Sequence, residues 1–318
     1  MLQKYYTYLL PFLLIFNQNI FAQNLDDFPI EWLPTSTGQA HNVQIIEHNY
    51  FTIGYNEDHE QAAWVAYELT KKELFKAAQR SNDFREDHNV ITYSADLTDY
   101  KGSGYDRGHL APAADMSFNT SAMSESFYLS NMSPQVAEFN RGVWKNLEEQ
   151  FRVWAYDLKS LYIITGPILE DGLKTIGKNQ VSVPNYYYKV ALFVDEDNEI
   201  YEAICFILPN QGSSSPLKSY VVSIDSLENR TGMDLFSGIP DELEDQIEEN
   251  VNLTFWPFYS ERKKSKVTKN TSQTKPNSTN TVIHLDGRCH GTTKKGTRCK
   301  RKTDDESGFC WQHLNQIK

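Results

Sequence analysis

Residues 105–115 of this 318-residue chain read YDRGHLAPAAD and place several reactive side chains next to one another. Asp106, Arg107 and His109 lie in one tetrapeptide with a single glycine, and Asp115 follows. A histidine ionises near neutral pH and can take a proton from water, while the paired donors of an arginine can stabilise charge that develops on a phosphate. A divalent cation usually completes a site that hydrolyses phosphodiesters. The stretch therefore indicates phosphodiester chemistry with His109 as the general base.

The sequence on either side of this stretch alternates between strand and helix patterns. Its composition, 40% hydrophobic and 13% aromatic, is that of a globular protein. Strand patterns are read at residues 63–69, at 161–165, and in two runs, 183–194 and 200–208, that an acidic turn joins into a hairpin. Helical spacing relates Trp144, Leu147, Phe151 and Trp154, and a short acidic helix is expected to begin at Pro240. Because strands and helices follow no regular βαβ rhythm, the pattern predicts an α+β domain.

The central stretch belongs to an ordered series of blocks. The other blocks are WVAY at 64–67, FRED at 84–87, FYLSNMSPQ at 127–135, NRGVWKNLE at 140–148, TGP at 165–167 and VP at 183–184. Together they resemble the DNA/RNA non-specific endonucleases of the ββα-metal class, which share a D-R-G-H motif, over roughly residues 45–255. The resemblance implies a mostly antiparallel central sheet flanked by helices. It also implies cleavage of DNA and RNA, single- or double-stranded, leaving 5′-phosphates.

The resemblance implies a role for each matching position. His109 would activate the attacking water, and Asn140 would be the direct protein ligand of one Mg²⁺, with Mn²⁺ as an alternative. Mg²⁺ suits a site with few protein ligands because it keeps most of its waters. Arg107 would stabilise phosphate charge and bind substrate, and Asn131 would be a supporting polar group in the site. Glu148 would orient metal-bound water from outside the direct ligands.

Helix geometry limits how Asn140 and Glu148 can share an ion. If residues 140–148 were all helical, the two would lie about 12 Å apart along the axis, so either Asn140 precedes the helix or Glu148 acts through water, which we favour.

Asp106 could partner the metal or His109, or hold its loop, and the structural role is favoured. The upstream arginine of the family could be Arg80 or Arg85. The 84–87 block favours Arg85 as a catalytic and substrate-binding residue.

The N-terminal 22 residues have the layout of a secretory signal peptide. Lys4 precedes a short apolar run, residues 9–16, and Ala22 follows. That run is too short for a membrane anchor, which needs about 20 apolar residues, so we expect export to the periplasm or the medium and no stable membrane insertion. The endonuclease domain would then span residues 23–259. Its substrates would be DNA and RNA, and its oligomeric state stays open, with a homodimer among the alternatives.

The charge of −11 is unevenly divided along the chain. Residues 261–318 hold 14 Lys and Arg against 5 Asp and Glu, so the tail is basic and the preceding body acidic. Residues 260–283, rich in Lys, Ser, Thr and Asn, predict a flexible linker, although the lysines could simply solubilise it. Attraction to polyanions would then come from the tail.

Residues 284–318 carry three cysteines and a histidine, Cys289, Cys299, Cys310 and His313. This set matches a structural Zn²⁺ site. A unit of about 30 residues has too small a core to fold without such a stabilising metal site. The segment resembles a small Cys3His module appended to varied bacterial proteins. A disulfide is the alternative in an exported protein. With Cys205 interpreted as a core thiol, three tail cysteines remain, and an odd number favours zinc. The module could attach to nucleic acid or serve as a structural cap.

Two further functions compete with a secreted nuclease. One is a catalytically inactive nucleic-acid-binding protein, against which the presence of His109, Asn140 and Glu148 argues. The other is a toxin aimed at other cells, which usually carries a delivery domain, and the sequence shows none.

Overall fold

The computed structural model describes residues 28–36, 43–195, 197 and 199–258, together with single residues and short runs of the tail that include the three cysteines and His313. The expected signal peptide at 1–22 and linker at 260–283 lie outside the described residues. Within the described residues, no helix has the length and apolar character needed to cross a bilayer.

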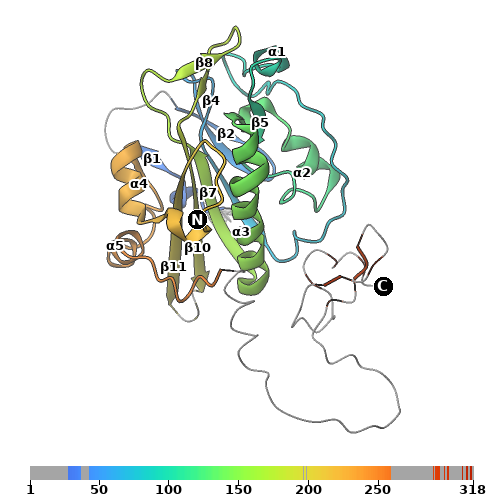
Figure 1. Ribbon diagram of the computed structural model, residues 1–318. Coiled ribbons are helices and arrows are strands. Elements are labelled where there is room, and N and C mark those ends of the chain that lie inside the picture. Colours follow the sequence, from blue (N-terminus) through green and yellow to red (C-terminus); the bar gives the residue numbers. More distant parts are fainter. Residues whose placement is uncertain are drawn as a thin grey trace, which may run out of the picture.

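A seven-stranded antiparallel sheet forms the centre of the domain (Figure 1). Its strand order is β12-β11-β10-β7-β4-β3-β2, with bounds Val221–Val222, Ile200–Pro209, Tyr186–Asp195, Ser160–Pro167, Gln61–Thr70, Thr52–Asn56 and Val43–Glu47. β10 and β11 form the expected hairpin, in which Asp195 pairs with Ile200. The strands expected at 63–69 and 161–165 are confirmed as the neighbouring β4 and β7.

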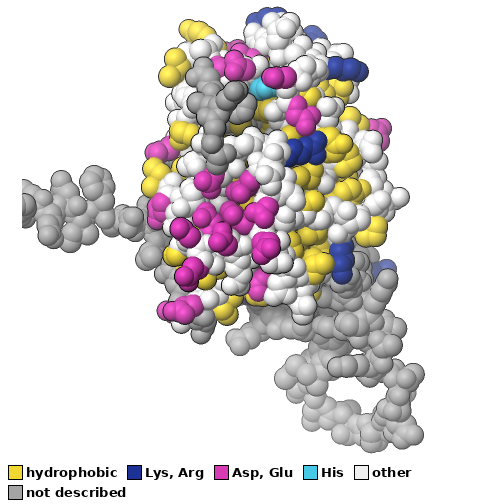
Figure 2. All heavy atoms as spheres, turned by 90° about the vertical axis from the view of Figure 1, so that its left-hand side faces the viewer, with side chains coloured by type: hydrophobic (Ala, Val, Ile, Leu, Met, Phe, Trp, Pro, Cys, Tyr) yellow, Lys and Arg dark blue, Asp and Glu magenta, His cyan; other side chains and the backbone are white. Residues whose placement is uncertain are grey.

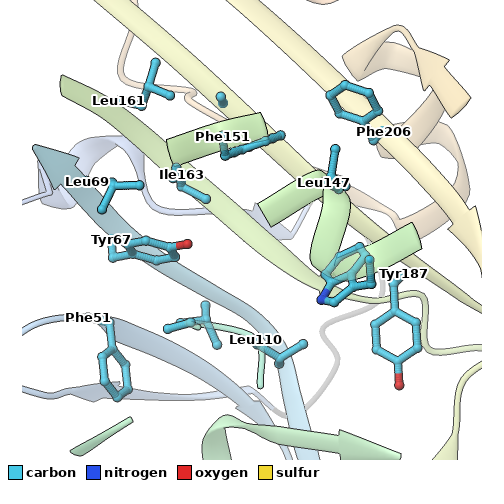
Figure 3. Packing of buried hydrophobic residues seen from close by; sticks show 14 of the residues in the cluster. Phe51, Tyr67, Leu69, Leu110, Leu147, Phe151, Leu161, Ile163, Tyr187 and Phe206 are labelled. Atoms are coloured by element: carbon cyan, nitrogen blue, oxygen red, sulfur yellow. The ribbon is translucent and has the colours of Figure 1, made fainter. Parts of the chain in front are cut away.

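The sheet separates two apolar layers because successive residues of a strand point to opposite faces. On one face, Val65, Tyr67 and Leu69 of β4 pack with Phe151 and other apolar residues of the long helix α3 (Lys145–Leu158), as Figure 3 shows for part of this cluster. On the other face, Trp64 and Ala66 pack in a second cluster with residues of α4 (Ile224–Thr231) and α5 (Asp241–Glu249). The expected α+β architecture is confirmed, including the helix that carries Phe151 and Trp154 and the acidic helix near residue 240.

A second, smaller set of elements lies beside α3 and carries the D-R-G-H motif. The motif itself is strand β5 (Asp106–His109), which pairs antiparallel with β6 (Met132–Gln135). A π-helical segment, η3 (Phe139–Trp144), follows β6 and leads directly into α3. The remaining short elements are η1 (Ile30–Trp32), β1 (Thr35–Ser36), α1 (Leu97–Tyr100), α2 (Thr120–Glu125), η2 (Leu129–Asn131), β8 (Lys174–Ile176), β9 (Val181–Val183), η5 (Leu217–Tyr220) and β13 (Met233–Asp234). Two strands followed by a helix are the arrangement that the ββα-metal resemblance implied.

Candidate active site

His109 ends β5 and is almost enclosed by aromatic rings. The ring is 9% exposed, and its centroid lies 4.8 Å from that of Phe127 and 5.8 Å from that of Phe84. Among the described residues, no group hydrogen-bonds its buried Nε2. Burial, together with the positive charges of Arg80 and Arg107, lowers the pKa of His109 to about 3. The imidazole is therefore neutral at physiological pH, which is the state in which it can accept a proton.

The backbone around His109 is fixed by contacts that leave little room. A Cβ on Gly108 would overlap the buried side chain of Gln135, so any larger residue at this point of the strand would displace Gln135. Just after His109, the buried Asn131 side chain clamps the next residues. Its Nδ2 donates to the carbonyls of Ala111 and Ser126 (3.0 and 2.9 Å), and its Oδ1 accepts from the Ala111 N–H at 2.9 Å.

Asn131 supports the site through the backbone. Its side chain is fully buried and both amide protons are used by the backbone. The residue positions the segment that follows His109 instead of presenting a polar group to a substrate.

Asp106, at the start of β5, connects the D-R-G-H strand to the η3 segment. Its Oδ2 accepts from Asn140 Nδ2 at 3.0 Å and from Arg141 Nε at 2.8 Å, and its Oδ1 accepts from Arg141 Nη2 at 2.6 Å. Hydrogen bonds from Arg141 and Asn140 and the charge of Arg141 outweigh partial burial and hold the pKa of Asp106 below its usual value. A carboxylate can only accept, so Nδ2 of Asn140 must face it. The sequence favoured a structural role for Asp106. In the structure, Asp106 orients the amide of Asn140.

Asn140 and Glu148 lie on different elements. Asn140 is in η3, where Gly142 has a non-helical conformation (φ −109°, ψ −109°) before the regular helix begins. Glu148 is in the first turn of α3. Asn140 therefore precedes the regular helix, and the action of Glu148 through water stays a prediction.

Glu148 belongs to a group of charges packed between α3 and the sheet. Arg152, one turn further along α3, forms an ion pair with Asp115 (2.6 Å) in which both side chains are almost completely buried. Burial raises the pKa of Glu148 to about 7, while the charges of Arg152 and Lys189 act in the opposite direction. Arg152 and Lys189 were not among the site residues expected from the sequence. The spacing of Glu148 and Arg152, four residues apart on one helix face, was the signal that could have found the first.

A cavity of about 650 Å³ opens beside β5 and η3. Its wall includes four cationic side chains, Arg80, Lys101, Arg107 and Arg141. It also includes three aromatic rings, Phe84, Tyr100 and Tyr105, together with Asp106 and Asn140. The guanidinium of Arg107 lies 4.1 Å above the ring of Phe84. Four positive side chains around one cavity favour the binding of a polyanionic ligand.

The two candidate upstream arginines differ in position. Arg80 lines the cavity, lies over the ring of Phe127 at 4.8 Å, and acts electrostatically on both His109 and Glu148. Arg85 does not line it. Its Nη1 donates to the carbonyl and carboxylate of Asp83 and to the carbonyl of Ser124, and its guanidinium lies 4.0 Å above the ring of Tyr128. The structure thus brings together Arg80, Arg107, His109 and Asn140, but not Arg85.

Comparison with known proteins agrees with this geometry. Residues 33–242 match the family of DNA/RNA non-specific endonucleases. This chain belongs to that family. The endonuclease is 35% identical to human mitochondrial endonuclease G over 205 residues, which are 60% of this chain and 69% of the relative. It is 37% identical to nuclease C1 of Cunninghamella echinulata var. echinulata over 207 residues, which are 60% of this chain and 82% of the relative.

A solved structure shows the same fold for the endonuclease. The crystal structure of a complex of EndoG with EndoGI contains a chain that superposes with a TM-score of 0.59 at 32% identity. The match covers 65% of this chain and 90% of the other. The protein is therefore an endonuclease that acts on nucleic acids, in a family of metal-dependent nucleases. The match ends before the C-terminal cysteines.

The C-terminal ligand set converges on one point. One ligand atom from each of Cys289, Cys299, Cys310 and His313 lies within 4.8 Å of the others, and all three cysteines are buried. Cys299 Sγ and Cys310 Sγ are 3.9 Å apart, and His313 Nδ1 lies 3.4 Å from Cys310 Sγ. The backbone N–H groups of Gly291 and Cys310 donate to Cys289 Sγ. Donation of this kind stabilises a thiolate.

Proposed function

We propose that the endonuclease hydrolyses phosphodiester bonds of both DNA and RNA with His109 as its general base. The observation that carries this proposal is the neutral, buried imidazole with its unpartnered Nε2, behind the ring of Phe84 in the wall of a cation-lined cavity. In the reaction, Nε2 accepts a proton from water while the water oxygen forms a bond to phosphorus. The bond from phosphorus to the 3′ oxygen breaks, which leaves a 5′-phosphate.

Arg80 and Arg107 stabilise the charge that grows on the phosphate, and Arg80 takes the place proposed from sequence for Arg85. Their charges face the cavity and also oppose protonation of His109. The same two cations would therefore bind the substrate phosphate and keep His109 unprotonated. Because phosphates are common to DNA and RNA and carry no sequence information, recognition by these cations supports cleavage without base specificity.

The residues present fit a hard divalent cation, and we assign Mg²⁺, with Mn²⁺ as an alternative. Asp106 holds Nδ2 of Asn140, which directs the Oδ1 of Asn140, an oxygen of the type that Mg²⁺ prefers, away from the carboxylate. When bound, the cation would polarise the phosphate and stabilise the leaving oxygen. Glu148 would orient water beside it.

Incubation of the purified full chain with plasmid DNA and with RNA, in Mg²⁺ or EDTA, tests the mechanism. We expect both substrates to be degraded only with Mg²⁺, and His109→Ala to lower the rate by about 10²- to 10⁴-fold. The exposed His88 provides the matched control, since His88→Ala should cleave as the wild type does. Intact nucleic acid in the presence of Mg²⁺, or full activity of His109→Ala, would contradict the proposal.

For the tail, we propose a structural Zn²⁺ bound by Cys289, Cys299, Cys310 and His313. A tetrahedron with Zn–S bonds of about 2.3 Å has sulfur–sulfur edges of about 3.8 Å, and the 3.9 Å between Cys299 and Cys310 is close to that edge. A disulfide would require about 2.05 Å. Metal analysis of the full chain should give one zinc per molecule, lost in Cys310→Ser. Absence of zinc, together with oxidised cysteines, would support the disulfide instead.

We propose that the enzyme is exported with removal of residues 1–22. The basic residue, short apolar run and small residue of this segment support the proposal. N-terminal sequencing of the protein recovered from the medium or periplasm of a producing bacterium should begin near residue 23. Recovery of the intact N-terminus only from the cell interior would refute export.

A further inference from the structure

Strand β10 places a lysine inside the apolar layer between the sheet and α3. Lys189 is fully buried. Its Nζ lies 5.3, 5.4 and 6.0 Å from the ring centroids of Tyr67, Phe151 and Trp144. Burial lowers the pKa of Lys189 to about 8, whereas the carboxylates of Asp115 and Glu148 favour its charged form.

A continuous line of contacts leads from this ammonium toward the active site. Lys189 Nζ donates to Tyr67 Oη at 3.1 Å, and Tyr67 Oη donates to Asp115 Oδ2 at 2.9 Å. The other oxygen of Asp115 accepts from Arg152 Nη1 at 2.6 Å. Three elements are joined in this way, because Lys189 is on β10, Tyr67 on β4 and Arg152 on α3.

This line connects α3, through Arg152, with the segment that follows the D-R-G-H strand, through Asp115. Asp115 closes a turn onto Pro112, three residues after His109, through its own N–H at 2.9 Å. Arg152 lies one helical turn from Glu148. The charged groups that act on Glu148 are Arg152 and Glu149 from its own helix, Lys189 and Tyr67 from the sheet, and Asp115 and Arg80 from the loops.

Stability alone does not explain a lysine at this position. Replacing a buried charged group and its partners by apolar residues of similar volume is often neutral or stabilising. The neighbours of Lys189 on the same face of β10, Tyr187 and Ala191, belong to the hydrophobic cluster. The ammonium instead supplies the second positive charge that, with Arg152, balances Asp115 and Glu148.

We propose that Lys189 is a positioning residue for phosphodiester cleavage, which acts through Tyr67 and Asp115 to hold Arg152 and Glu148 in place, with Glu148 facing the charge of Arg80. The inference rests on the proposed function, since it concerns the same active site. Lys189 itself touches neither substrate nor metal.

The test compares Lys189→Met, Tyr67→Phe and the double variant with the wild type, in kcat, KM, pH profile and melting temperature. Met keeps the length of the side chain and removes the charge, and Phe removes one hydroxyl. For each single variant we expect kcat to fall by about tenfold to a hundredfold with KM almost unchanged. In Lys189→Met we also expect the acid limb of the rate to move to higher pH, because Glu148 loses a stabilising positive charge. The double variant should be no slower than the slower single variant, because both changes break one line of contacts.

Val190→Ala is the matched control, because Val190 is the next residue of β10 and packs on the opposite face. It should lower the melting temperature and leave kcat of the folded enzyme unchanged. Wild-type kcat in folded Lys189→Met or Tyr67→Phe would overturn the proposal, as would a wild-type pH profile in Lys189→Met or multiplicative losses in the double variant. The proposed function fails on a different result, namely full activity of His109→Ala, so the two failures are distinguishable.

Discussion

Replacing Asp106 with Ala removes the acceptor that fixes the amide of Asn140. In the native arrangement, Nδ2 of Asn140 points to Asp106 at 3.0 Å, and the proposed function assigns the Oδ1 to the cation. Without the carboxylate, the amide can rotate by half a turn and present Nδ2, a donor that repels a cation. The protein would fold, since Asp106 lies near the surface, but its metal site would be organised for only part of the time.

The size of the effect follows from the hydrogen bond that is lost. A hydrogen bond to a charged acceptor contributes about 1.5–3 kcal/mol, and each 1.4 kcal/mol is a factor of about ten in affinity. Asp106→Ala should therefore weaken Mg²⁺ binding by about tenfold to a hundredfold, as is typical when the partner of a metal ligand is removed. Arg141→Ala should change the affinity much less, because Arg141 is exposed and its loss leaves the contact between Asp106 and Asn140 in place.

The assay is cleavage of plasmid DNA as a function of Mg²⁺ concentration, from which the concentration for half-maximal rate is read. Asp106→Asn keeps an oxygen acceptor without the charge and should lie between the wild type and Asp106→Ala. An unchanged half-maximal concentration in Asp106→Ala would refute the orientation argument. Equal effects of Asp106→Asn and Asp106→Ala would show that charge, and not orientation, is what the metal site requires.

Three further predictions concern residues whose roles the structure changed or added. Arg80→Ala should lower the cleavage rate by about 10²-fold, whereas Arg85→Ala should change it only slightly, and rates measured at saturating Mg²⁺ separate the two. Asn131→Ala should lower the free energy of unfolding by about 2–5 kcal/mol, measured by urea denaturation, because three buried backbone groups lose their partner. On the acidic face that carries α4 and α5 (Figure 2), burial and neighbouring carboxylates raise the pKa of Glu248 to about 8 and that of Glu244 to about 7. The folded state therefore binds more protons than the unfolded state above pH 4.5, so stability falls as the pH rises toward 8, and Glu248→Gln should raise the melting temperature at pH 8 more than at pH 5. An equal gain at both pH values would contradict this assignment.

Local patterns in the sequence were sufficient for several parts of the molecule. The alternation in residues 63–69 and the turn between 194 and 200 specify β4 and the β10–β11 hairpin, because side-chain direction in a strand repeats every two residues. The D-R-G-H motif identified His109, since a base, a cation and a glycine in one short stretch is a local property. The set of tail ligands is equally visible in the linear chain.

Other assignments depended on which distant residues meet. Arg80 and Arg85 are five positions apart in one irregular segment, and only the packing of that segment against residues 124–128 turns one to the cavity and the other to Asp83. The motif suggested a supporting polar role for Asn131, and only the fold shows that its side chain bonds the backbone of Ala111 and Ser126.

The sequence by itself therefore indicated the strands β4, β7, β10 and β11, the long helix, and the family of this endonuclease. The tertiary structure decided which upstream arginine lines the cavity, where Asn140 lies relative to the helix, and which charged groups are buried beside Glu148. Lys189 and Tyr67 are 122 residues apart and meet because β10 and β4 flank the same strand, β7, with their side chains on one face. Periodicity sets the face on which a side chain lies, but strand order and register set its neighbours, and no local pattern encodes those.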